Sequence, residues 1–211
     1  MVYPDIFMKY IDLTHTFKQS MPVYPGDPVP ELKQIAFADK DGYNDFQITT
    51  GMHVGTHMDA PLHMLQNGKR LSEYSADHFF GKGHLIDARE KSIDTDLLEG
   101  KQISKGDIVL IMTGFSSKFG TPEYYESYPE ISEAFASKIV EFGVSIVGMD
   151  TPSPDRPPFD IHKLLLGNDV LIIENLTNLE SLLEHVQFSI AALPAKFDSE
   201  AAPVRVVAQI P

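Results

Sequence analysis

The sequence predicts a single α/β domain over residues 1–211, with mixed β-sheets and flanking helices. Three observations support this prediction. One hydrophobic core can be built by a chain of 211 residues. In the second half, helical patterns, glycines and short apolar runs alternate, which indicates strand–helix–strand units. The first half contains several strand-like runs and little helix, so mainly parallel pairing is not assured.

Short apolar runs bounded by turn residues predict the strands. They lie at Tyr10–Thr14, Phe46–His53, Gly83–Ala88, Ile108–Thr113, Val144–Met149, Val170–Ile173, Phe188–Leu193 and Val204–Ala208. The run Ile108–Thr113 is nearly all apolar, so we expect it to be buried on both faces. The segment Met21–Pro30 contains four prolines and one glycine, which predicts a rigid, turn-rich loop.

Two helices are expected. Apolar residues at three- and four-residue steps predict an amphipathic helix over Glu130–Phe142, and Gly143 supplies its C-terminal end. A shorter helix is predicted over Ile161–Leu166, with Asp160 as its N-terminal cap. Gly167 is expected to terminate this second helix.

Composition limits the function. The formal net charge of −13 argues against nucleic acid and anionic membranes as partners. Cysteine is absent, which excludes thiolate nucleophiles, disulfides and iron–sulfur clusters. Any transition metal would therefore be bound by imidazole and carboxylate groups. The first residues, Met1–Leu13, lack the pattern of a secretory signal, so we expect a cytoplasmic protein that acts on a small-molecule substrate.

The segment GMHVGTHMDAPLH, residues 51–63, concentrates the residues that can carry chemistry. Within eleven residues it contains His53, His57, Asp59 and His63. A straight strand would spread these side chains over roughly 33 Å, at about 3.3 Å per residue, and Gly55 and Pro61 argue against a helix. A sharp bend at Gly55–Thr56 would instead let His53, His57 and Asp59 converge.

Metal binding suits these residue types. Neutral imidazole nitrogen and carboxylate oxygen bind Zn²⁺, Mn²⁺ or Fe²⁺. A single histidine is usually structural, but three with an aspartate in so short a segment favour a metal site. His162, in the first turn of the predicted helix, is a further candidate ligand. So is Glu174, because an unpaired carboxylate directly after the apolar run Val170–Ile173 would be costly.

Other polar residues are weaker candidates. Asp150, Ser153 and Asp155 follow a predicted strand and precede the helix that contains His162, so they can line a site. Turn formation explains them equally well. His15 ends the first predicted strand and can approach the same region. The sequence leaves the roles of these four residues open.

Three segments of the sequence resemble those of a known family. HVGTHMDAPLH resembles the signature H-x-G-T-H-x-D-x-P-x-H of the cyclase family of metal-dependent hydrolases, which includes bacterial kynurenine formamidase and isatin hydrolase. VYPGDP at 23–28 resembles the family's N-terminal loop, and residues 192–208 resemble its C-terminal segment. The resemblance implies a fold of the swivelling β/β/α type and assembly as a homodimer or tetramer.

The resemblance also implies a ligand set. His53, His57, Asp59 and Glu174 would bind one divalent ion, and Asp59, His162 and Glu174 would bind a second. Both carboxylates would then bridge the two ions. The expected cofactor is Zn²⁺, with one or two ions per chain, or Mn²⁺.

Two further roles follow from the resemblance. His63 would be the catalytic proton shuttle, and Tyr24 would contact the substrate where the formamidase has a tryptophan. The expected reaction is hydrolysis of a small amide C–N bond by metal-activated water. An aryl formamide such as N-formylkynurenine is the first choice of substrate. A cyclic amide like isatin, or another small acyl compound, stays open because Tyr24 replaces the tryptophan.

Two other classes of protein compete with the hydrolase. In a mononuclear iron oxygenase, His57, Asp59 and His162 would form a two-histidine, one-carboxylate triad. Ile172 then stands where a basic partner for 2-oxoglutarate is expected, and His53 and His63 would have no role. A non-catalytic metal-binding domain would take up metal without hydrolysing any formamide or cyclic amide.

Overall fold

The computed structural model describes residues 8–211. The prediction that no secretory signal is present concerns Met1–Leu13, and part of this segment lies outside the described residues. The strands are β1 (Lys9–Asp12), β2 (Glu31–Ala36), β3 (Asp45–Thr49), β4 (His57–Asp59), β5 (Phe80–Asp87), β6 (Ile108–Met112), β7 (Ile146–Met149), β8 (Leu171–Glu174), β9 (Ser189–Pro194) and β10 (Ala201–Ile210). The α-helices are α1 (Ala38–Asp41), α2 (Pro122–Glu126), α3 (Glu133–Phe142) and α4 (Asp160–Gly167).

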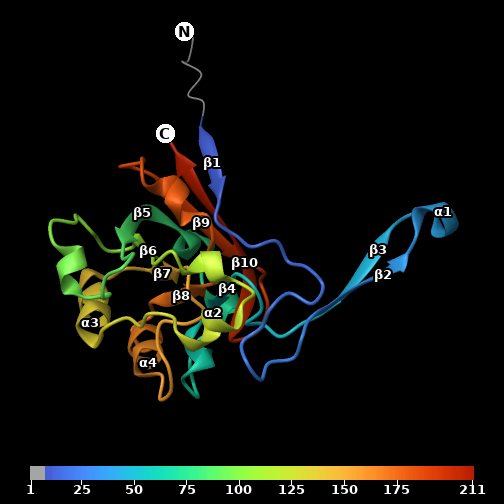
Figure 1. Cartoon of the computed structure of the whole chain (residues 1–211), viewed down its shortest axis with the longest axis horizontal. Coiled ribbons are helices and arrows are strands. Elements are labelled where there is room, and N and C mark those ends of the chain that lie inside the picture. Colours follow the sequence, from blue (N-terminus) through green and yellow to red (C-terminus); the bar gives the residue numbers. More distant parts are fainter. Residues whose placement is uncertain (1–7) are drawn as a thin grey trace, which may run out of the picture.

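Seven strands close into a barrel in the order β4-β8-β7-β6-β5-β9-β10, because β10 pairs with both β4 and β9. The neighbours from β5 through β8 are parallel, and the other pairs of the barrel are antiparallel. β1 adds to the edge of β10. The expected mixed sheet with flanking helices is therefore confirmed, and the helices α3 and α4 lie on one side of the barrel (Figure 1).

The core lies on both faces of the parallel strands. In β6, Ile108 and Leu110 belong to one apolar cluster, and Val109 and Ile111 belong to the other. The second cluster contains residues of α3 and α4, such as Phe135. All five residues of β6 are buried, which confirms the expectation that this run is covered on both faces.

The helix boundaries differ from those predicted. The helix α3 begins three residues later than expected, because the Ser132 hydroxyl accepts a hydrogen bond from the Phe135 N–H at 3.0 Å and caps the helix there. The predicted cap at Asp160 is wrong, since α4 begins at Asp160 and Phe159 occupies the N-cap position. The Asp155 carboxylate instead accepts from the Ile161 N–H at 2.7 Å.

The strand predicted over Phe46–His53 is wrong at its C-terminal end. β3 ends at Thr49 and pairs only with β2, and this hairpin projects from the barrel as an arm with α1 at its tip (Figure 1). The chain then runs irregularly through two glycines, Gly51 and Gly55, before it enters the barrel as β4. Within residues 8–211, no helix has both the length and the hydrophobicity needed to cross a bilayer.

Candidate metal centre

A bend at Gly55 brings the predicted ligands together. Gly55 has a φ of +67°, a conformation that glycine adopts without steric cost. After it, His57 and Asp59 lie in β4 on the same face, because side chains alternate along a strand. Met58 points the other way and is completely buried in the core. The predicted bend is therefore confirmed, although the strand follows it rather than preceding it.

The pairing of β4 with β8 adds Glu174, the fourth predicted ligand. The register places His57 directly opposite Glu174, and the His57 Nε2 atom lies 3.3 Å from Glu174 Oε2. The same Nε2 atom lies 3.4 Å from Asp59 Oδ1. His53, on the irregular segment before the bend, places its Nδ1 atom 3.0 Å from Asp59 Oδ1. The two carboxylates thus lie among the imidazoles of His53 and His57.

His162 completes the cluster from the first turn of α4. Its Nε2 atom lies 3.3 Å from Glu174 Oε1, so Glu174 stands between His57 and His162. On its other side, His162 Nδ1 lies 2.5 Å from Asp155 Oδ1. A carboxylate at this second nitrogen fixes the orientation of the ring and leaves the first nitrogen free to bind a metal.

These residues fit a divalent cation. Two overlapping groups have ligand atoms within 4.8 Å of one another: His53, His57 and Asp59 form one, and Asp59, His63 and His162 form the other. Both carboxylate oxygens of Asp59 and the Nε2 atom of His57 are buried and make no hydrogen bond of acceptable geometry. A buried carboxylate that makes no hydrogen bond is unfavourable even beside imidazoles, and a bound cation would satisfy these atoms.

The charges of the metal-free cluster compensate one another. Burial by itself favours neutral imidazole, but Asp59 and Glu174 outweigh it and raise the pKa of His57 to about 9. Burial is likewise outweighed at His162, where Asp155 and Glu174 raise the pKa to about 10. Despite its own burial, Asp59 has a pKa below its usual range because His57 and His53 lie beside it. Protons thus occupy positions that a metal ion would take.

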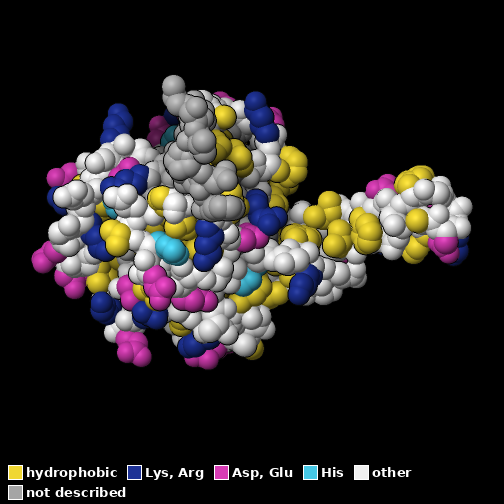
Figure 2. Space-filling view, turned by 90° about the horizontal axis from the view of Figure 1, so that it is seen from above, with side chains coloured by type: hydrophobic (Ala, Val, Ile, Leu, Met, Phe, Trp, Pro, Cys, Tyr) yellow, Lys and Arg dark blue, Asp and Glu magenta, His cyan; other side chains and the backbone are white. Residues whose placement is uncertain are grey.

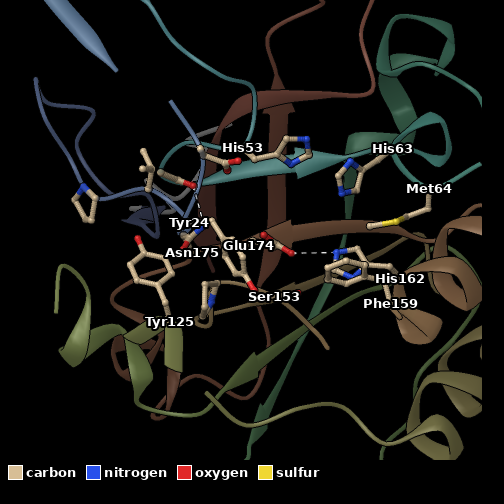
Figure 3. A pocket seen from close by; sticks show the side chains of 15 residues that line it. Tyr24, His53, His63, Met64, Tyr125, Ser153, Phe159, His162, Glu174 and Asn175 are labelled. Atoms are coloured by element: carbon tan, nitrogen blue, oxygen red, sulfur yellow. Dashed lines mark hydrogen bonds and ion pairs between the residues drawn. The ribbon is translucent and has the colours of Figure 1, made fainter. Parts of the chain in front are cut away.

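A cavity of about 240 Å³ opens beside the cluster. The imidazoles of His53, His63 and His162 gather at one end of it, and Tyr125 lies at the other (Figure 3). The lining residues are Pro22, Val23, Tyr24, Asp27, His53, Gly55, His63, Met64, Tyr125, Pro152, Ser153, Phe159, His162, Glu174 and Asn175. The predicted substrate residue, Tyr24, therefore lines the cavity. Its ring packs edge-on against that of Tyr125, with 5.9 Å between the ring centroids.

The four residues with open roles are now placed. Asp155 holds His162, and Ser153 lines the cavity. Asp150 has a structural role, because it accepts hydrogen bonds from Thr113 and from the Gly114 N–H. His15 does not line this cavity and lies in a separate surface depression.

Asn175 is a site residue that the sequence reasoning missed. Its Nδ2 atom donates to the Gly55 carbonyl at 3.0 Å, and its Oδ1 atom accepts from the Tyr124 hydroxyl at 2.9 Å. The Gly55 carbonyl also contacts His57 Nδ1 at 2.9 Å, so Asn175 helps to position the ring of His57. One available signal was its place directly after Glu174. Glu200 was missed as well; its Oε1 atom lies 3.5 Å from His53 Nε2.

The chain is similar to known proteins over nearly its whole length. The chain is 38% identical to an uncharacterized protein of Methanocaldococcus jannaschii, over 95% of this chain and 99% of the other. It is 30% identical to a kynurenine formamidase of Geobacillus thermodenitrificans, over 93% and 95% of the two chains. The structure of isatin hydrolase A from Labrenzia aggregata has the same fold, with a TM-score of 0.84 and 24% identity over 96% and 94%. The model of the Cyclase family matches residues 11–156, and the chain belongs to this cyclase family.

Proposed function

We propose that this protein is a metal-dependent hydrolase that cleaves a small amide C–N bond, with an aryl formamide such as N-formylkynurenine as substrate. The observation that carries the proposal is the unsatisfied Asp59 carboxylate, shared by two groups of possible ligands beside an open cavity. The kynurenine formamidase named above matches the chain over nearly its whole length. Family membership therefore supports the same reaction class.

The metal would be held by His53, His57 and Asp59, with Glu174 and His162 available for a second ion. A divalent ion at such a site polarises a carbonyl group and lowers the pKa of a bound water to roughly 7. The identity of the ion, Zn²⁺ or Mn²⁺, is part of the proposal, since both accept this ligand set.

His63 is the proposed proton shuttle. It lines the cavity, and its ring centroid lies 4.2 Å from that of His53. Burial lowers the pKa of His63, so the neutral ring is ready to accept a proton. It takes a proton from the attacking water as the new C–O bond forms, and it returns this proton to the nitrogen as the C–N bond breaks. The products are formate and an aryl amine.

The position of His63 also permits a second role, because its ring is one of the possible ligands grouped with Asp59 and His162. Metal content separates the two roles. If His63 is the shuttle, a protein with His63→Ala retains its metal and loses activity. If His63 is a ligand, the same substitution lowers the amount of metal bound.

A cyclic amide is the second candidate substrate, and one observation favours it. Among the described residues that line the cavity, none is a lysine or arginine. The amino-acid carboxylate of N-formylkynurenine would therefore find no lysine or arginine within the cavity, whereas a neutral ring such as isatin needs none. The aromatic lining by Tyr24, Tyr125 and Phe159 suits both compounds.

Elemental analysis combined with two activity assays tests the proposal. The purified protein is expected to contain one or two equivalents of Zn²⁺ or Mn²⁺ and to hydrolyse N-formylkynurenine, and chelation is expected to abolish this activity. Turnover of isatin alone would transfer the proposal to the cyclic amide. Bound metal with no hydrolysis of any formamide or cyclic amide would contradict the hydrolase and favour a non-catalytic metal-binding domain.

A further inference from the structure

The cavity has one acidic residue that the candidate metal centre does not use. Among the described residues that line it, the acidic and histidine side chains are Asp27, His53, His63, His162 and Glu174. The three histidines gather at the end opposite Tyr125 (Figure 3). Glu174 belongs with them, because it lies 3.3 Å from both His57 and His162. Asp27 therefore remains as a separate negative charge in the wall of the cavity.

A tight turn places Asp27 beside the aromatic end of the cavity. The Asp27 N–H donates to the Tyr24 carbonyl at 3.0 Å, and Gly26 between them has a φ of +103°. Backbone atoms thus close the turn, and the carboxylate is not required to form it. Burial, and after it the negative charge of Asp27, raises the pKa of Tyr125 to about 12. The charge of Asp27 is therefore felt at Tyr125, whose ring packs against that of Tyr24.

The lining offers no basic side chain to neutralise Asp27. Within the described part of the lining there is no lysine or arginine. Arg156 follows the lining residue Ser153 closely in sequence, but its guanidinium group pairs with Glu130 and lies 3.9 Å from the ring centroid of Tyr128. A carboxylate beside aromatic rings suits an ammonium group, which gains both an ion pair and cation–π contacts there.

The charge of the whole molecule acts in the same direction, but more weakly. A net charge of −13 attracts cations and repels anions. Figure 2 shows acidic and basic side chains interspersed over one face of the barrel, and salt screens charges on the surface beyond about 10 Å at 0.1 M. Selection by charge therefore depends mainly on the carboxylate in the cavity wall.

We propose that Asp27, with Tyr24 and Tyr125, binds a protonated amine of the substrate. This inference rests on the proposed function, and it narrows the substrate to an aryl amide whose side chain ends in an ammonium group and has no carboxylate. N-formylkynurenine has the ammonium group but also a carboxylate, and isatin has neither. Asp27 is thus a residue for specificity, because it contacts the far end of the substrate and not the bond that is cleaved.

Three ortho-formamidophenyl ketones test this charge selection. They have side chains of equal length that end in an ammonium, a methyl or a carboxylate group. The wild-type protein is expected to hydrolyse the ammonium compound with a kcat/KM ~5-fold above that of the methyl compound, the upper end for an exposed ion pair, and the carboxylate compound with the lowest value. Most of the difference should lie in KM, because the ion pair is equally present before and during bond cleavage.

Two variants of Asp27 change the order of the three compounds. Asp27→Asn should lower the ratio between the ammonium and methyl compounds ~5-fold, and Asp27→Lys should move the carboxylate compound above the ammonium compound. Asp96→Asn is the matched control, since it removes the same charge from an exposed residue outside the lining, and it should retain the wild-type order. An unchanged ratio in Asp27→Asn, or a wild type that does not prefer the ammonium compound, would overturn the inference.

Binding separates this inference from the proposed function. The deformylated amines with ammonium and methyl ends can be titrated into the purified protein by calorimetry. The ammonium compound should bind ~5-fold more tightly, and Asp27→Asn should remove this preference. This preference without hydrolysis of any formamide would contradict the hydrolase and retain the amine-binding subsite. Hydrolysis of the formamides with equal binding of the two amines would overturn the subsite and retain the hydrolase.

Discussion

The strands β6 and β3 have the same length and opposite environments. All five residues of β6 are buried, whereas all five residues of β3 are exposed. β6 has parallel neighbours on both sides, and β3 has only β2 as a neighbour. The comparison teaches that the position of a strand in the topology decides its burial. A central strand is covered on both faces, whereas the rest of the chain covers neither face of a projecting hairpin.

The candidate metal centre lies where these two regions meet. His57, Asp59 and Glu174 belong to strands of the barrel and are buried. His53 follows the arm, and its side chain is 25% exposed. Tyr24 precedes the arm. We therefore expect the barrel to determine metal affinity and the segments at the base of the arm to influence mainly the substrate.

The largest effect is expected for a ligand of the barrel. Asp59→Ala should abolish metal binding and activity, because both ligand groups include this carboxylate. His53→Ala should retain part of the metal, since the other ligands stay in place. Metal content by elemental analysis measures both. Full occupancy in Asp59→Ala would refute its bridging role, and equal losses in the two variants would remove the distinction between barrel and base of the arm.

The next effect concerns rate alone. His63→Ala should lower turnover by ~10²–10⁴, the usual contribution of a positioned acid–base group, and should leave the metal bound. Steady-state kinetics together with elemental analysis measures this. His185→Ala, which lies away from the lining of the cavity, serves as the control. A loss of metal in the His63 variant would reassign this residue as a ligand.

Core substitutions test the comparison of β6 with β3 directly. Ile111→Ala should lower the free energy of unfolding by about 2–5 kcal/mol, because Ile111 is fully buried. Ile48→Ala should change it by only about 0.5 kcal/mol or less, because Ile48 is 52% exposed. Chemical denaturation measures both free energies. Equal losses in the two variants would contradict the comparison.

A smaller effect is expected from the residue that holds His162. Asp155→Asn should weaken metal binding by ~10–100-fold, because the hydrogen bond at the second ring nitrogen fixes the orientation of a metal-bound histidine. Titration with the metal measures the affinity. Asp160→Asn changes an exposed carboxylate at the start of the same helix and should have little influence. Equal affinities in the wild type and the Asp155 variant would show that packing alone orients His162.

The last effect is a pH dependence of the stability of the metal-free protein. A pKa of His57 raised from 6.5 to about 9 contributes stability that is fully present below pH 6.5 and is lost as the pH rises through about 9. Thermal unfolding in the presence of a chelator should therefore give a lower midpoint at pH 10 than at pH 7. The metal-loaded protein should lack this decrease, because its bound imidazoles are already neutral. Identical pH profiles would contradict the raised pKa.

The sequence by itself determined the part of the site in which residues close together in the chain converge. Gly55 lies between His53 and His57 and provides the bend, so nearby residues fix this part of the site. The apolar run at 108–113 likewise predicts a buried strand without knowledge of its neighbours. Helix ends were less certain, because the cap of α4 comes from Asp155 rather than from the adjacent Asp160.

Only the tertiary structure decided which distant residues face this segment. The pairing of β4 with β8 sets Glu174 opposite His57 across more than a hundred residues of sequence. The same holds for the contact of Asn175 with the Gly55 carbonyl. The projection of the arm was equally hidden, since the sequence of β3 does not show that it pairs with β2 alone, outside the barrel. Local periodicity reflects the burial pattern of one strand, whereas the hydrogen-bond register between remote strands depends on how the whole sheet closes.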